Sequence, residues 1–87
     1  MGRGVNAVKA ALVAEFGAIN IEVDEDITTR EILLYFSAEG RQFLVRVSRD
    51  YDEAFASGQV KADLGHLGAM LRKSKDGTAV VKTDGIR

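Results

Sequence analysis

The segment 31–47 constrains the fold more than any other stretch, because two runs rich in β-branched and aromatic residues flank a glycine-containing turn. Such a pattern is typical of a β-hairpin. If Phe36 pairs with Phe43, the apolar residues of the two runs align on common faces, since side chains alternate along a strand. This register needs an even number of loop residues. We therefore expect either a two-residue turn at Glu39-Gly40 or a four-residue loop from Ala38 to Arg41.

Both faces of the predicted hairpin carry large apolar residues. One face would hold Ile32, Leu34, Phe36, Phe43, Val45 and Val47. The other face would hold Leu33, Tyr35 and Leu44 beside Arg46. Three large apolar residues on a face that is normally wet indicate either a surface for a partner or a covering element from the same chain. Cover by the same chain is the simpler explanation, and Leu33, Tyr35 and Leu44 are a candidate interaction surface otherwise.

Helical and strand patterns precede the hairpin. Apolar residues recur at helical spacing over 5–16, and Gly17 supplies a stop, so we expect a helix there after a flexible lead-in at 1–4. Residues 18–24 alternate apolar and polar, as in a half-buried strand.

After the hairpin, the segment 48–55 has a capping serine or aspartate and acidic residues in its first turn, which predicts a short helical turn. Residues 60–74 repeat leucines at helical spacing and predict the second main helix. Residues 78–83 predict a short strand, and 84–87 a tail. The chain is expected to be one domain over 1–87, because a chain of this length cannot divide into two cores.

These elements predict an α+β fold in the order α-β-β-β-α-β. Two helices would cover one face of a small, mainly antiparallel sheet of three to four strands. The last strand could extend the sheet beside either the first or the third strand. The order resembles that of double-stranded-RNA-binding domains, but the Gly-Pro-x-His and Lys-Lys-x-Ala-Lys motifs of that family are absent.

Composition excludes several function classes. The chain contains no cysteine, has a net charge of −1, and contains no apolar run near the roughly 20 residues of a membrane span. We expect a cytoplasmic protein with no membrane partner, no thiolate chemistry and no cofactor.

His66 is the only histidine, and no serine is placed as its nucleophile, so we expect a surface imidazole and no enzymatic activity. The acidic residues of 22–26 lack the spacing of an EF-hand, and we expect no metal site.

Charge is unevenly distributed along the chain. Residues 22–39 contain six acidic residues and one basic residue, whereas 61–87 contain six basic and three acidic residues. The basic residues Arg72, Lys73, Lys75 and Lys82 are the candidate contacts for nucleic acid or another anion. Cations in the last turn of a helix are also favoured by the helix dipole, which is the structural explanation for the same cluster.

Small residues form a stripe on each predicted helix. The first stripe is Ala7, Ala10 and Ala14, and the second is Ala62, Gly65 and Ala69. Gly65 and Gly68 should each cost a helix roughly 0.8–1 kcal/mol relative to alanine. Small stripes allow helices to approach closely, so we expect a helix contact across a two-fold homodimer. The predicted function is a non-enzymatic, self-associating protein-interaction module, with nucleic-acid binding by the basic end of the second helix as the alternative.

Overall fold

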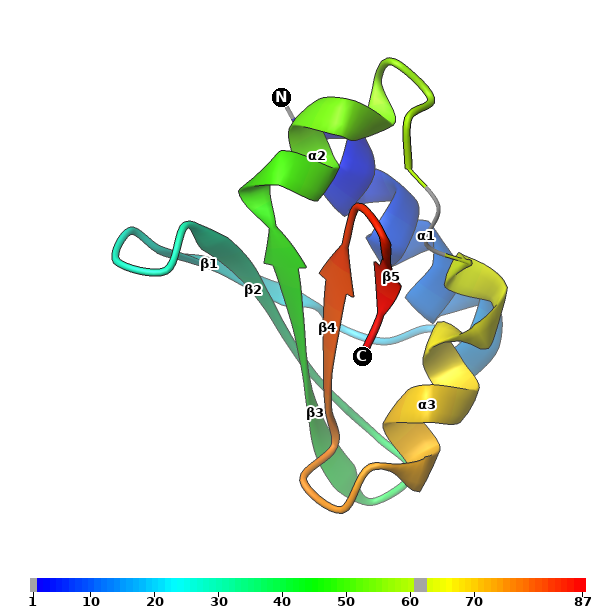
Figure 1. Cartoon of the computed structure of the whole chain (residues 1–87). Coiled ribbons are helices and arrows are strands. Elements are labelled where there is room, and N and C mark those ends of the chain that lie inside the picture. The colour runs from blue at the N-terminus through cyan, green and yellow to red at the C-terminus, as the bar shows by residue number, and fades with distance from the viewer. Residues whose placement is uncertain (1, 61–62) are drawn as a thin grey trace.

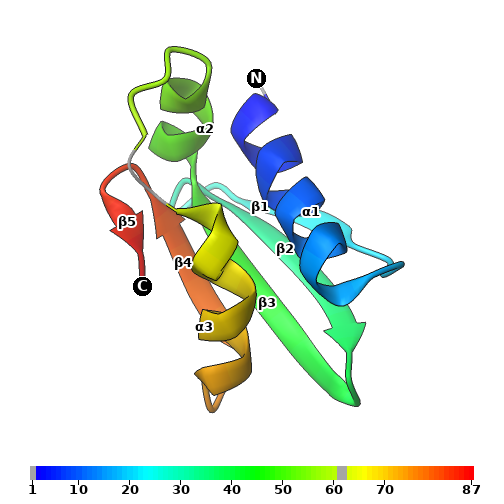
Figure 2. The ribbon, with the colours of Figure 1, turned by 90° about the vertical axis from the view of Figure 1, so that its right-hand side faces the viewer.

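The computed structural model describes residues 2–60 and 63–87. Its elements are α1 (Arg3–Phe16), β1 (Glu22–Asp26), β2 (Glu31–Ala38), β3 (Arg41–Ser48), α2 (Arg49–Phe55), the 3₁₀ turn η1 (Leu64–His66), α3 (Leu67–Lys73), β4 (Thr78–Lys82) and β5 (Gly85–Ile86). The fold is α+β, as predicted. The strands form one sheet in the order β1-β2-β3-β4-β5. The helices lie on the same side of this sheet (Figures 1 and 2).

The β2–β3 hairpin has the predicted register. Phe36 pairs with Phe43, and the pairs on either side continue in step to Glu31 and Ser48. Glu39 and Gly40 form the two-residue turn, with φ of 55° and 74°. Two successive positive φ values define the turn type whose twist matches that of the flanking strands. The hairpin therefore places one apolar face under the helices and the other face outward.

The sheet is larger and more mixed than predicted. The β3–β4 pairing is parallel, which resolves the open placement of the fourth strand, whereas the other pairings are antiparallel. A parallel connection needs a crossover, and α2, η1 and α3 supply it. The expected tail instead contains β5, because the chain turns back and Arg87 exchanges two backbone hydrogen bonds of 2.8 and 2.9 Å with Val80.

Helix α1 begins at Arg3, inside the expected lead-in, because a distant side chain caps it. Asp52 is buried, and its carboxylate accepts hydrogen bonds from the backbone N–H groups of Gly2 and Val5 at 2.8 and 2.9 Å. These bonds satisfy amides that a helix start leaves unpaired. The cap joins α1 to α2, which starts at the predicted position with the Ser48 hydroxyl accepting from Tyr51 N–H.

Two other boundaries differ from the sequence prediction. The strand expected at 18–24 forms at 22–26, while Ile19 and Ile21 still pack against the core from the preceding segment. The helix expected at 60–74 is, within its described residues, η1 followed by α3. Asp63 accepts from Gly65 N–H at 2.9 Å and starts the tighter turn. The helix ends at Lys73, as expected near Ser74.

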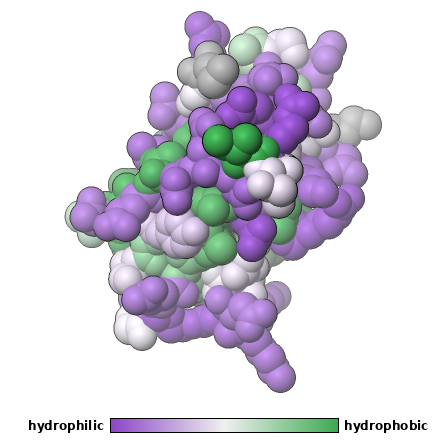
Figure 3. Space-filling view, turned by 90° about the vertical axis from the view of Figure 1, so that its left-hand side faces the viewer, coloured by the Kyte–Doolittle hydropathy of each residue, from purple (hydrophilic) through white to green (hydrophobic). Residues whose placement is uncertain are grey.

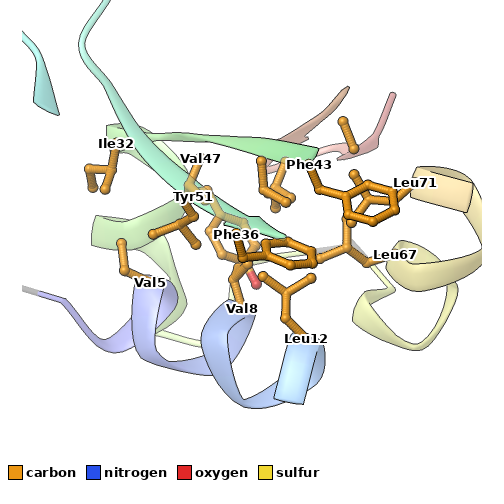
Figure 4. Packing of buried hydrophobic residues seen from close by; sticks show 14 residues of the cluster. Val5, Val8, Leu12, Ile32, Phe36, Phe43, Val47, Tyr51, Leu67 and Leu71 are labelled. Carbon is orange, nitrogen blue, oxygen red and sulfur yellow. The ribbon is translucent and has the colours of Figure 1, made fainter. Parts of the chain in front are cut away.

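The core lies between the sheet and the helices (Figure 4). Its fully buried residues come from α1, β2, β3, α2, α3 and β4: examples are Val8, Leu12, Leu34, Val45, Val47, Tyr51, Leu67, Leu71 and Val81. Phe16 at the end of α1 contacts Phe36 and Phe43, with ring centroids 5.2 and 5.3 Å apart. This aromatic cluster closes the turn end of the hairpin against α1.

The contact between α1 and α2 generates a prediction for Gly4. A Cβ atom at Gly4 would lie 2.7 Å from Asp52 Cα and 3.1 Å from Tyr51 Cδ1. Gly4→Ala should therefore lower the free energy of unfolding by about 1–3 kcal/mol, although alanine is the better helix former. Chemical denaturation measures the change. Gly65→Ala is the control, because Gly65 is exposed, and it should stay within about 0.5 kcal/mol of the wild type.

Candidate functional site

The face of the sheet away from the helices carries the apolar residues that the sequence singled out. Leu33 pairs with Arg46 and Tyr35 pairs with Leu44, so all four side chains share this open face. Tyr35 is 39% exposed, and Leu33 and Leu44 are partly buried. The expectation that another element of the chain covers them is wrong for the described residues, because the helices pack on the opposite face (Figure 2). Figure 3 shows this side of the molecule, with hydrophobic side chains among hydrophilic ones.

Val80 belongs to the same face and was missed by sequence reasoning. In the β3–β4 register Val80 stands beside Arg46, and Thr78 stands beside Leu44. The alternation of residues 78–82 indicates a strand with two faces. It does not reveal which strand β4 pairs with, or which of its residues lie on the open side of the sheet. The open apolar surface, defined here as Leu33, Tyr35, Leu44 and Val80, therefore spans three neighbouring strands.

Opposite charges border the open apolar surface. Along β1, three acidic side chains share the open face, since they pair with Tyr35, Leu33 and Glu31; they are Glu22, Asp24 and Asp26. We call them the acidic margin. At the other side of the sheet, Lys82 continues the outward alternation of β4, and Arg87 pairs with Val80; these two form the cationic margin. Between the margins, Arg46 and Glu31 form an ion pair of 3.1 Å.

A second apolar surface lies on α1. Ala10, Val13 and Ala14 line a shallow hollow with Ile19 and Ile21, and Lys9 stands at its rim. Val13 is 45% exposed, and Ala10 and Ala14 are exposed as well, whereas Ala7 is partly buried. The alanine stripe of the sequence analysis is thus mostly on the surface. Val13 is larger than the small residues that define the stripe, and the two isoleucines lie beyond the end of α1.

The two small-residue stripes approach each other within one chain. Ala14 and Gly65 line the same narrow hollow between α1 and the η1–α3 segment. Gly68 is buried, and an added Cβ would collide with the side chain of Glu15 on α1. The close contact that the glycines permit is therefore made inside the chain. Ala69 is exposed, and Ala62 lies outside the described residues.

The predicted anion cluster is divided by the structure, because Arg72 is already bound to carboxylates. Its guanidinium contacts Glu15 at 2.6 Å and Glu39 at 2.8 Å, and it lies 4.6 Å from the Phe16 ring centroid. These contacts join α3 to the end of α1 and to the β2–β3 turn. The Glu39 hydrogen bond raises the pKa of Arg72, so its positive charge is held more firmly.

The other members of the cluster lie at two ends of the molecule. Lys73 and Lys75 are exposed at the end of α3, and neither forms an ion pair with a described residue. Lys82 ends β4, in a groove that also contains Arg30, Arg49 and Arg87.

Arg41 performs a role that the sequence did not indicate, since it donates to the carbonyls of Arg72 and Ser74 at 3.0 and 2.6 Å and satisfies the end of α3.

The remaining candidates for chemistry are surface groups. His66 Nε2 lies 3.2 Å from Asp63 Oδ2, and the two side chains are 75% and 69% exposed. Among the described residues, no group of three His, Cys, Asp or Glu side chains is arranged to hold a metal ion. The helices of the described chain are all too short or too polar to cross a membrane.

Comparisons with protein-family models, curated proteins and solved structures found no match for this chain.

The Arg72 contacts generate a prediction for Glu39. Its hydrogen bond to Arg72 is the largest cause that lowers the pKa of Glu39 below the ordinary value of 4.5. This contribution to stability is complete above pH 4.5 and is lost as the pH falls through the lowered pKa. In Arg72→Gln, an NMR titration should show the pKa of Glu39 returning towards 4.5. Lys73→Gln, the control on the next residue, should leave the titration of Glu39 unchanged.

Proposed function

We propose that this chain is a non-enzymatic protein-interaction module that self-associates through the open face of its sheet. The observation that carries the proposal is the open apolar surface, which no described helix covers. Burial of apolar area is the main favourable term in most protein associations, worth roughly 25 cal/mol per Å². Tyr35, at 39% exposure, is the residue with most of this area still to bury.

The open face also has the rigidity that an interface requires. β2 and β3 are eight-residue strands in the interior of the sheet, each paired on both sides. Their inner faces are anchored by buried residues, so the outward side chains are held in place before any partner arrives. A surface ordered in advance loses less conformational entropy on binding. The hollow on α1 is the weaker candidate, because two of its lining residues are alanines and its isoleucines come from the segment before the edge strand β1.

The area of a standard interface determines how much of the open face must be buried. A standard interface buries about 800 Å² on each partner. The molecule measures 35 × 26 × 22 Å, so an interface of that area takes up most of one face. The open apolar surface alone is too small, and the acidic and cationic margins must be included.

Nucleic-acid binding, the alternative predicted from the sequence, has less support. Arg72 is engaged with Glu15 and Glu39, and Lys82 is separated from Lys73 and Lys75 by the length of β4. Lys73, the last residue of α3, and Lys75, just beyond the helix, supply too few phosphate contacts for appreciable affinity at physiological salt.

Self-association can be tested with Leu33→Thr/Leu44→Thr, which removes apolar area and retains residues that favour strands. The wild type should sediment as a dimer at micromolar concentration, and the double variant should raise the dissociation constant at least tenfold. Sedimentation velocity over a wide concentration range measures both. Tyr35→Thr is a milder second variant, and thermal melting checks that each variant is folded.

Val13→Gln is the matched control, because it removes an exposed apolar side chain from the hollow on α1 instead. It should leave the dissociation constant unchanged. A wild type that remains monomeric at high micromolar concentration would refute the proposal. Loss of the dimer in Val13→Gln alone would transfer the interface to α1, and a salt-sensitive anisotropy signal with labelled RNA or DNA, in a monomer, would favour the alternative function.

A further inference from the structure

We propose, resting on the proposed function, that the partner is a second copy related by a two-fold axis parallel to the strands, which places the acidic margin of each copy against the cationic margin of the other. The two sheets would pack face to face with nearly aligned strands, as sheets that pack on each other commonly do. The orientation is inferred from the order of charges across the sheet and from their levels along the strands.

The register assigns a level along the strands to each residue of the open face. Asp24 stands level with Leu33 and Arg46, and through the β3–β4 pairing with Val80. Arg87 pairs with Val80 and reaches the same level. One step of two residues further, Asp26 stands level with Glu31 and Ser48. Lys82 lies two residues beyond Val80 and belongs to this second level. Acidic and basic residues therefore occupy equal levels at opposite sides of the sheet.

When the strands of the two sheets are aligned, two-fold symmetry allows two face-to-face arrangements. The charges of the open face favour one of them over the other. An axis parallel to the strands exchanges the two sides of the sheet and preserves the levels. It brings β1 of one copy over β4 of the other, so Asp26 meets Lys82 of the second copy. An axis across the strands places β1 over β1, and three acidic residues of one copy oppose the same three of the other. Like charges in an interface are unfavourable, which favours the parallel axis.

Tyr35 and Leu44 fit the same arrangement, whereas Val80 comes level with Asp24 of the second copy, beside Arg87. With the axis between β2 and β3, Tyr35 of each copy lies over Leu44 of the other, and each contact occurs twice. Leu33 lies near Arg46 of the second copy, whose charge is offset by its ion pair with Glu31 at 3.1 Å. Two copies of each apolar contact form the centre of the interface, with charges at both margins. An apolar centre and a polar rim are the usual anatomy of a protein interface.

Lys82 is the member of the cationic margin whose charge is not used in an ion pair with a described residue. It lies in a groove at one end of the strands, which runs from the β1–β2 loop to the β4–β5 turn. The charged residues of this groove are the basic Arg30, Arg49, Lys82 and Arg87 and the acidic Glu31, Asp50 and Asp84. Arg49 is paired with Glu25, and Arg87 with Asp84. Lys82 has no ion pair with a described residue, so its charge is available to an acidic strand.

Charge reversal at each margin tests the orientation. One variant carries Asp24→Lys, and the other carries Arg87→Glu, because these two residues stand at the same level in opposite margins. Each alone should weaken self-association at least tenfold, because the contact between these two residues occurs twice and becomes repulsive. An equimolar mixture should form a heterodimer with an affinity near that of the wild type, since both contacts are then attractive. A chain with both changes should self-associate again.

Sedimentation velocity and native mass spectrometry measure these species, and circular-dichroism melts check folding. Asp26 is left unchanged because it accepts hydrogen bonds from Thr28 and Thr29 in the loop. A wild-type dimer that both variants leave intact would overturn the orientation and not the proposed function. The orientation would also be overturned if the β1 variant paired preferentially with the wild type, because that result indicates that β1 of one copy lies over β1 of the other. A monomeric wild type would overturn both proposals together.

Discussion

The pairing of Phe36 with Phe43 is the constraint on which the rest of the structure depends. Because side chains alternate along a strand, this register decides for every residue of β2 and β3 whether it faces the helices or faces outward. A slip of one residue would move Leu34 and Val45 out of the core and replace them with Leu33 and Leu44. The stacked rings, 5.2 Å apart, are themselves held by Phe16 from α1. The register and the docking of the first helix therefore stabilise each other.

Polar contacts at the helix ends tie the helices to one another and to the hairpin turn, and these contacts join segments distant in sequence. Asp52 of α2 caps the start of α1, and Arg72 of α3 binds Glu15 at the end of α1 and Glu39 in the hairpin turn. Close approach makes the contacts feasible, since Gly4 leaves room for the α2 backbone and Gly68 leaves room for Glu15. The glycines that weaken helix propensity locally are offset by packing between helices within the same chain.

Local patterns predicted the parts of this fold that depend on local rules. The hairpin register, the Glu39-Gly40 turn, the Ser48 cap and the end of α3 follow from residue spacing and turn chemistry. The parallel placement of β4 and the start of α1 at Arg3 depend on long-range contacts that spacing does not reveal, whereas the η1 turn that shortens α3 starts at the local Asp63 cap. The same limit applies to the surface. Leu33, Tyr35 and Leu44 were identifiable by parity, whereas Val80 joined them only once β4 was placed beside β3.

The net charge of −1 conceals a sheet with two oppositely charged sides. The acidic residues are concentrated at 22–39 and the basic residues at 61–87, and the order of strands across the sheet is the same as their order along the chain. The charge gradient of the sequence thus becomes a gradient across the open face, from β1 to β4. An acidic edge strand also resists unwanted pairing with other sheets. The acidic residues of β1 that protect the edge also make the two sides of the open face differ in charge. A face whose sides differ in charge can favour one orientation of a second copy over the other.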